Sequence, residues 1–169
     1  MMNKTVYWTK LACDGREWLA AASPEGLCYV GASLDAFNEW KRKRLSGCEV
    51  LQDQEQMGPF TTELAEYFNG QRTTFSLPLD LRGTPFQQAV WRALCEIPYG
   101  QTRAYADIAR EVGRPEAVRA AGAAIGANPI WIVVPCHRVI GKNGALTGYR
   151  GGLDLKRRLL QLEGAFVQH

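Results

Sequence analysis

The sequence of 169 residues has only two histidines and no closely spaced pair of cysteines, and both shortages argue against disulfide-rich and zinc-binding proteins. Its five cysteines are odd in number and none stands in a C-x-x-C pair, which argues against a disulfide framework and suits the reducing cytoplasm. A Cys2His2 zinc site would need both His137 and His169, and a site on Cys13, Cys28 and Cys48 has no ligand motif behind it. We therefore expect neither a metal nor a cofactor.

Long apolar runs are also missing. None reaches the roughly 18 residues that span a bilayer, and the first eight residues lack the apolar stretch and the cleavage site of a secretory signal. Apolar residues make up 46% of the chain and charged residues 22%, which excludes disordered and fibrous proteins. We expect a cytoplasmic monomer of one ordinary domain or two small ones, with no membrane partner.

The net charge of +3 is small, but it is unevenly distributed. Residues 1–83 hold 9 Lys and Arg against 11 Asp and Glu, whereas residues 84–169 hold 11 against 6. A polyanion would therefore bind the C-terminal half. Chance in two small counts explains the difference equally well.

The first half of the chain alternates strand and helix patterns. Three β-like runs separated by turn signals predict an antiparallel meander, at residues 6–13, 17–22 and 27–32. Helical patterns follow at residues 34–45 and 59–69. The basic cluster at residues 41–44 could contact phosphates, although a solvated helix end explains it better.

Residues 77–85 form an extended connector in this interpretation, and we place the boundary between domain 1–80 and domain 81–169 within it. Thr84 then caps a helix whose first position is Pro85. Apolar residues at helical spacing continue that helix toward Pro98.

Two short helical patterns, at residues 104–112 and 116–127, flank a glycine turn and predict a helix-turn-helix. The second pattern is almost entirely Ala and Gly, with Arg119 as its one large charged side chain. Such a surface is poor at hydrogen-bonding base edges, because Ala and Gly have no polar side-chain groups, but it allows close approach to a minor groove with Arg119 as the probe. Close packing against another helix, with Arg119 in solvent, explains the pattern equally well.

An apolar run at residues 130–134 predicts a buried strand, and it leads into Pro135, Cys136 and His137. A thiol beside an imidazole is a plausible nucleophile. Neighbouring residues of a strand point to opposite faces, so a direct Cys136–His137 pair would need a local turn. On spacing alone, a buried and inert Cys136 is the slightly better explanation.

The residues around this element resemble the O6-alkylguanine-DNA alkyltransferases, also called methylated-DNA–protein-cysteine methyltransferases. The most specific matches are at residues 128–141, 148–152 and 156–164, with further matches at 84–91 and 104–109. The resemblance extends through nearly all of residues 83–169 and is loose before them. The size is similar to that of the stand-alone bacterial type.

The resemblance implies DNA repair by one-use, irreversible transfer of a methyl or larger alkyl group from O6-alkylguanine, or from O4-alkylthymine, in duplex DNA. The base has to leave the stack, because O6 is otherwise out of reach. Cys136 matches the alkyl acceptor, His137 the general base acting through a water, and Glu163 the carboxylate that orients the histidine. Tyr105 matches the proton donor at guanine N3, and Arg119 the finger that replaces the flipped nucleotide.

The resemblance also implies residues that surround the DNA and the base. The DNA-binding set is Thr84, Arg119, Ala120, Ala121, Gly122 and Ala123. The pocket set is Asn128, Val139, Tyr149, Arg150, Gly151 and Lys156. Arg150 departs from the small or hydroxylated residue that is common at its position, which bears on the size of the alkyl group accepted.

The fold class implied is α/β (α+β), with an N-terminal ribonuclease-H-like antiparallel sheet and helices and a C-terminal winged-helix-like domain. Its wing would lie at residues 139–149. The alternative function is a non-catalytic lesion-binding protein of the alkyltransferase-like type, which lacks the acceptor cysteine. A sequence-specific regulator and an unrelated Cys-His hydrolase are weaker hypotheses, because neither accounts for both the small-residue helix and Arg119.

Overall fold

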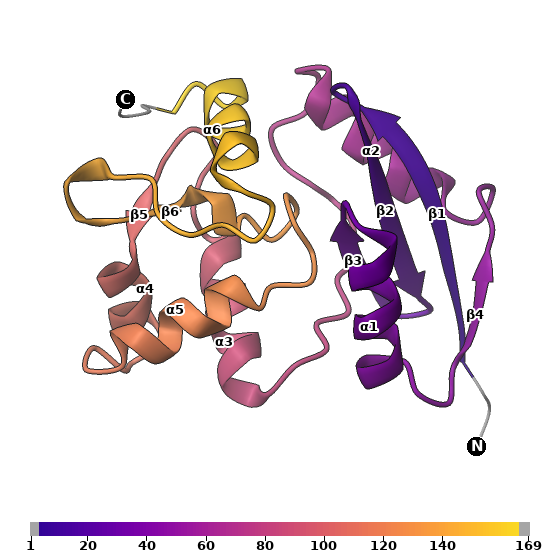
Figure 1. Cartoon of the computed structure of the whole chain (residues 1–169), viewed down its shortest axis with the longest axis horizontal. Helices are drawn as coiled ribbons and strands as arrows, with labels where there is room; N and C mark the ends of the chain where they lie inside the picture. Colours follow the sequence, from indigo (N-terminus) through magenta and orange to yellow (C-terminus); the bar gives the residue numbers. More distant parts are fainter. Residues whose placement is uncertain (1–3, 166–169) are drawn as a thin grey trace. The chain divides into compact units, whose positions relative to one another are not determined.

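The computed structural model describes residues 4–165, and the chain divides into two compact units between Arg82 and Gly83 (Figure 1). His169, considered above as a zinc ligand, lies outside the described residues. Among the described residues, no helix has the length and apolar character needed to cross a membrane.

The N-terminal unit contains the expected antiparallel meander. Its strands are β1 (Thr5–Cys13), β2 (Arg16–Ser23) and β3 (Gly26–Gly31). Asp14 and Gly15, at φ 54° and 76°, form the tight turn between β1 and β2. A fourth strand that the sequence did not reveal, β4 (Glu49–Gln52), pairs in parallel with β1 and gives the order β3-β2-β1-β4.

Two helices cover opposite faces of this sheet (Figure 1). The helix α1 (Leu34–Arg44) brings Phe37 to a buried cluster with Val6, Leu19, Ala21, Cys28 and Tyr29. The helix α2 (Gly58–Phe68) packs Phe68 against Trp18, with ring centroids 5.3 Å apart. The expected helices therefore form within one or two residues of their predicted ends.

The connector is extended and lies along β3. The Leu27 amide donates to the Pro78 carbonyl at 2.9 Å, and the Asp80 amide donates to the Leu27 carbonyl at 2.8 Å. A Cβ at Gly26 would lie 2.4 Å from the Pro78 carbonyl oxygen, so this approach requires glycine. The connector is thus fixed to the N-terminal unit up to Asp80.

The C-terminal unit is mainly helical, with α3 (Pro85–Cys95), α4 (Tyr105–Glu111), α5 (Val118–Gly126) and α6 (Leu153–Leu162). Thr84 caps α3 as predicted, in a reciprocal capping box with Gln87. The helices α3, α4 and α5 pack together, and the buried Trp91 indole donates to the Ala124 carbonyl at 2.8 Å. The helix-turn-helix is α4 and α5, although α5 begins two residues later than predicted because the turn extends to Ala117.

The buried strand predicted at residues 130–134 is wrong. This segment is a tight buried turn, in which Ile132 has φ 74° and the Val134 amide donates to the Ile130 carbonyl at 3.0 Å. A short apolar run reports burial and cannot by itself distinguish a strand from another buried conformation. The only strands described in this unit have two residues each. They are β5 (Arg103–Ala104), before α4, and β6 (Val139–Ile140), after the buried turn, and they pair in parallel. The predicted wing is the loop after β6, which contains a 3-10 turn at Lys142–Gly144 and no returning strand.

Candidate active site

Cys136 begins a 3-10 turn, Cys136–Arg138, that directly follows the buried turn. Cys136 and His137 therefore lie in a turn and not on a strand, but within residues 4–165 their side chains form no hydrogen bond with each other. Cys136 is 6% exposed and His137 is fully buried, so the thiol stands at the edge of the protein interior.

Asn128 organises the turn around the thiol. Its side-chain amide donates to the Val134 carbonyl at 2.9 Å and to Cys136 Sγ at 3.1 Å, and its carbonyl oxygen accepts from the Ile130 amide at 2.9 Å. One buried side chain thus ties both ends of the turn and supplies a donor to sulfur. Asn128 is therefore within hydrogen-bond distance of the thiol.

The pKa of Cys136 results from opposing influences. Burial raises it, whereas the hydrogen bond from Asn128, the charge of Lys156 and the hydrogen bond from Tyr149 lower it. The donors favour the thiolate, which is the nucleophilic form of cysteine. The site therefore holds a protonated thiol that is prepared to carry negative charge once a base takes its proton.

His137 is joined to Glu163, which caps the C-terminal end of α6. The distance from His137 Nε2 to Glu163 Oε2 is 2.7 Å, and both side chains are fully buried. The carboxylate accepts the Nε2 proton, so the other ring nitrogen, Nδ1, is an acceptor. Nδ1 is buried and has no hydrogen-bond partner within residues 4–165.

Arg138 is a third member of this group, and the sequence motif alone did not reveal its role. Its guanidinium donates to both Glu163 oxygens, at 2.8 and 3.0 Å, and to the Ile97 carbonyl at 2.7 Å. It also lies over the Tyr99 ring, 5.7 Å from the centroid. Its position directly after Cys136 and His137 was a signal that could have suggested this role.

These contacts set the charges of the pair. Burial opposes the charge on Glu163, but hydrogen bonds from His137 and Arg138 and their charges lower its pKa to about 2. Burial lowers the pKa of His137 despite the carboxylate beside it. The resting site thus contains a neutral imidazole held by an ionised glutamate, and the imidazole can accept a proton.

The predicted pocket residues lie at different depths. Lys156 is buried, and its ammonium donates to the carbonyls of Val139, at 2.5 Å, and Thr147, at 2.8 Å. Tyr149 packs against Trp131 with ring centroids 5.7 Å apart. A Cβ at Gly151 would lie within 3.0 Å of both rings, so this close approach needs glycine. Arg150 is exposed.

Tyr105 is the first residue of α4 and is half-buried. The Thr147 hydroxyl donates to the Tyr105 hydroxyl at 3.1 Å. On the other side, a Cβ at Gly122 would lie 3.7 Å from the Tyr105 ring. Tyr105 therefore lies between α5 and the loop after β6, which follows the 3-10 turn at Cys136–Arg138.

The predicted DNA-binding residues of α5 divide by exposure. Arg119, Ala120 and Ala123 are exposed, Gly122 is half-buried, and Ala121 is fully buried in the helical core. One face of this helix packs closely against the core, and the other is a smooth exposed surface around Arg119. Thr84 is exposed at the start of α3. Within residues 4–165, no three His, Cys, Asp or Glu side chains are grouped to hold a metal ion.

Comparisons with known proteins agree along nearly the whole chain. The family model described as 6-O-methylguanine DNA methyltransferase, DNA binding domain, matches residues 85–165, and the one described as its ribonuclease-like domain matches residues 6–81. The inducible methylated-DNA–protein-cysteine methyltransferase of Bacillus subtilis is 50% identical over 162 residues, which cover 94% of this chain and 90% of the relative. The methylated-DNA–protein-cysteine methyltransferase of Methanosarcina acetivorans is 47% identical over 147 residues, or 87% of this chain and 91% of the relative.

Solved structures show the same similarity. The crystal structure of Mycobacterium tuberculosis OGT in complex with DNA has a TM-score of 0.82 and 41% identity, and the match covers 94% of this chain and 92% of that chain. The fold and the buried thiol thus define a class of DNA-binding proteins that act through a cysteine. Within that class, the chain belongs to the O6-methylguanine-DNA methyltransferase family, as the motifs around Cys136 predicted.

Proposed function

We propose that the protein repairs DNA by transferring an alkyl group from O6 of guanine to Cys136 in a single, irreversible turnover. The observation that carries the proposal is the buried thiol among hydrogen-bond donors, next to a histidine that a carboxylate holds at 2.7 Å. The names of the relatives and their similarity over both units support the same activity.

Activation of the thiol follows from the charges of the site. His137 Nδ1 takes the Cys136 proton through an intervening water, and the imidazolium that forms is stabilised by Glu163. Arg138 keeps that carboxylate ionised and fixed. Asn128 and Lys156 stabilise the thiolate that results.

The transfer itself is an in-line displacement at the alkyl carbon. The sulfur forms a bond to carbon as the bond from carbon to O6 breaks, and the electron pair remains on guanine. A guanine anion is a poor leaving group, so Tyr105 donates its hydroxyl proton to N3. The thioether product is not hydrolysed under mild conditions, and the protein is consumed.

Access to O6 in a duplex requires the base to leave the stack. In the proposal, α5 lies in the minor groove, and Ala120 and Ala123 allow close approach while Arg119 fills the vacated space. Thr84, at the start of α3, contacts the DNA backbone in this proposal. Because Ala121 is fully buried, its part is in packing beneath that surface.

The flipped base would lie beside Cys136, with Tyr149 and Gly151 closing over it and Val139 and Lys156 behind. Arg150 at the rim limits the alkyl groups accepted, and O4-alkylthymine is a second substrate to test. All groups named belong to one chain, so we propose that a monomer acts, and its thiols suit the cytoplasm.

The alternative, a lesion-binding protein without chemistry, is not favoured because the acceptor cysteine is present with its base and carboxylate. The deciding experiment is the intact mass of the protein after mixing with a duplex that carries one O6-methylguanine, with Cys136→Ala as control. We expect one added methyl group per wild-type chain and none on the variant. Tight binding without a mass gain would support the alternative.

A further inference from the structure

The loop after the reactive turn contacts Tyr105 through Thr147, a residue so far without a role. Thr147 Oγ1 donates to the Tyr105 hydroxyl oxygen at 3.1 Å. When Thr147 is the donor of this pair, the Tyr105 O–H is directed elsewhere and can itself donate. A phenol that gives its proton to guanine needs this orientation.

The Thr147 side chain is exposed, but its methyl carbon lies against Gly141. A Cβ at Gly141 would lie 3.1 Å from the Thr147 methyl carbon and 3.6 Å from its hydroxyl oxygen, so the methyl group packs on the glycine. The branched side chain has few alternative rotamers. With the methyl group on Gly141, the hydroxyl faces Tyr105.

The backbone of Thr147 is held as well. Its carbonyl and that of Val139 both accept from the buried Lys156 ammonium, at 2.8 and 2.5 Å. The β6 strand that starts at Val139 pairs with β5, and Ala104 of β5 immediately precedes Tyr105. One buried cation therefore fixes both ends of the loop relative to the tyrosine.

We propose that Thr147 is a positioning residue for the alkyl transfer, orienting the Tyr105 hydroxyl and stabilising the oxygen as its proton leaves. This inference rests on the proposed function. In the step, the thiolate bonds to the alkyl carbon, the C–O6 bond breaks, and the Tyr105 proton moves to guanine N3. The oxygen of Tyr105 is left as a phenolate, whose hydrogen bond from Thr147 becomes charge-assisted and stronger.

The test is the single-turnover rate of methyl transfer from an O6-methylguanine duplex. Thr147→Val keeps the branched shape and removes the hydroxyl, whereas Thr147→Ser keeps the hydroxyl. We expect Thr147→Val to lower the maximal rate about tenfold, which corresponds to about 1.4 kcal/mol. Half-saturation by DNA should be unchanged, and Thr147→Ser should recover most of the rate.

Two controls separate orientation of Tyr105 from a general structural effect. In the Tyr105→Phe background, Thr147→Val should not lower the transfer rate further, because the hydroxyl that Thr147 contacts is already absent. Alkylation of Cys136 by iodoacetamide should be unaffected, because iodide leaves without a proton. A neutral Thr147→Val, or a loss that adds fully to Tyr105→Phe, would overturn the inference while leaving the proposed function intact. Failure of the wild-type protein to gain a methyl group would instead overturn the proposed function.

Discussion

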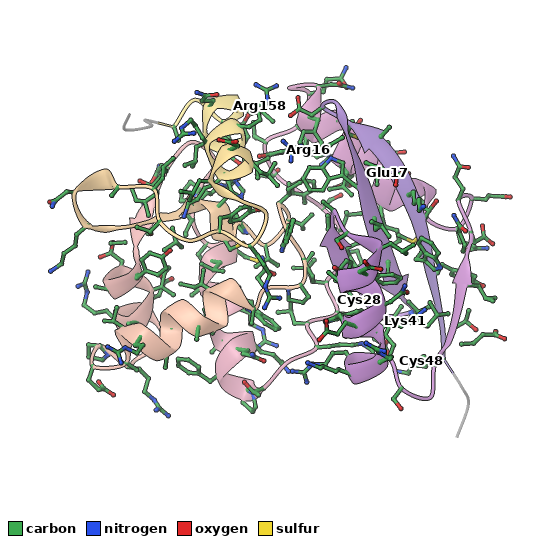
Figure 2. The ribbon with its side chains drawn as sticks, viewed as in Figure 1. Arg16, Glu17, Cys28, Lys41, Cys48 and Arg158 are labelled. Carbon is green, nitrogen blue, oxygen red and sulfur yellow. The ribbon has the colours of Figure 1, made fainter. Side chains whose placement is uncertain are left out.

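Cys28 in the N-terminal unit and Cys136 in the C-terminal unit are both buried thiols, with exposures of 0% and 6%. Cys28 lies on β3 against α1 (Figure 2). Burial is the largest influence on both and raises both pKa values, that of Cys28 to about 12. Burial alone therefore does not distinguish a structural cysteine from a reactive one.

The hydrogen-bond partners do distinguish them. Cys28 donates its S–H to the Ala21 carbonyl at 3.4 Å, which requires the protonated thiol. The charge of Asp80 raises its pKa further, and this influence is larger than the lowering by Arg82 or that by a backbone hydrogen bond from Ser23.

Cys136 instead accepts from Asn128, and the charge of Lys156 lowers its pKa, so both neighbours favour the thiolate. A reactive cysteine is thus one whose neighbours donate to sulfur, next to a base that can remove its proton.

The largest expected difference is between two single variants, Cys136→Ala and Cys28→Ala, in their ability to accept a methyl group. Cys136→Ala should abolish the mass gain after mixing with an O6-methylguanine duplex. Cys28→Ala should retain one methyl group per chain, although it should lower stability by creating a small cavity. Loss of transfer in folded Cys28→Ala would contradict the division between the two units.

Glu163→Gln should have the next largest effect, because it removes the charge that stabilises the imidazolium of His137. We expect transfer to slow by roughly 100-fold, within the usual range for acid–base assistance. The pKa of Cys136, followed by thiolate absorbance, should rise. An unchanged thiol titration would argue against the relay from Cys136 through His137 to Glu163.

Arg119→Ala should separate base flipping from chemistry. The exposed side chain makes no contact needed for the thiol, so transfer from free O6-methylguanine should be unchanged. Transfer from duplex DNA should fall about tenfold, because no side chain then fills the space that the flipped nucleotide leaves in the duplex. Arg157→Ala on α6 removes the same charge and serves as the control. Equal losses on both substrates would reject the assignment of Arg119.

Acid should destabilise the protein through Glu163. Its pKa falls from 4.5 to about 2 on folding, so the unfolded chain binds more protons between these values. The stability that the ionised carboxylate contributes is complete above pH 4.5 and is lost as the pH falls to about 2. Urea titrations across this window should show a shallower loss for Glu163→Gln than for the wild-type protein.

Glu25→Gln is the matched control for that measurement in the N-terminal unit. The pKa of Glu25 is also lowered, chiefly by its hydrogen bond to Lys4, but the group is exposed and solvent screens the pair. Its substitution should leave the pH dependence almost unchanged. An equal effect of the two substitutions would show that the buried relay has no special role in acid stability.

The sequence predicts best where the information is local. The helix cap at Thr84, the turn at Asp14 and Gly15 and the spacing of α4 and α5 each involve neighbouring residues, and the structure contains all three. The buried turn after Asn128 was mistaken for a strand, because its conformation depends on side-chain hydrogen bonds that apolar spacing does not report.

The site shows the same limit. Glu163 lies 26 residues from His137, and only the family resemblance connected them before the structure placed them 2.7 Å apart. Arg138 was overlooked although it adjoins His137, because its function lies in a contact with a distant carboxylate. The short strand β4 was missed because its four residues carry little apolar pattern of their own.

The smallest effect that we predict is a loss of stability when one helix cap in each unit is removed. Ser33 caps α1 by accepting from the Ala36 amide at 3.2 Å, and Thr84 caps α3 by accepting from the Gln87 amide at 3.1 Å. Alanine at either position should lower the free energy of unfolding by about 1 kcal/mol, because one helix N–H loses its acceptor.

Affinity for DNA should then distinguish the two caps. Thr84 is exposed at the N-terminus of α3, in the unit that carries α5, the helix proposed to bind DNA. Thr84→Ala should therefore also weaken binding to an undamaged duplex by a few-fold. Ser33→Ala should leave that affinity unchanged at every salt concentration. If the caps lower stability equally and neither changes DNA binding, Thr84 serves the fold alone, and the DNA-contacting surface begins at α5.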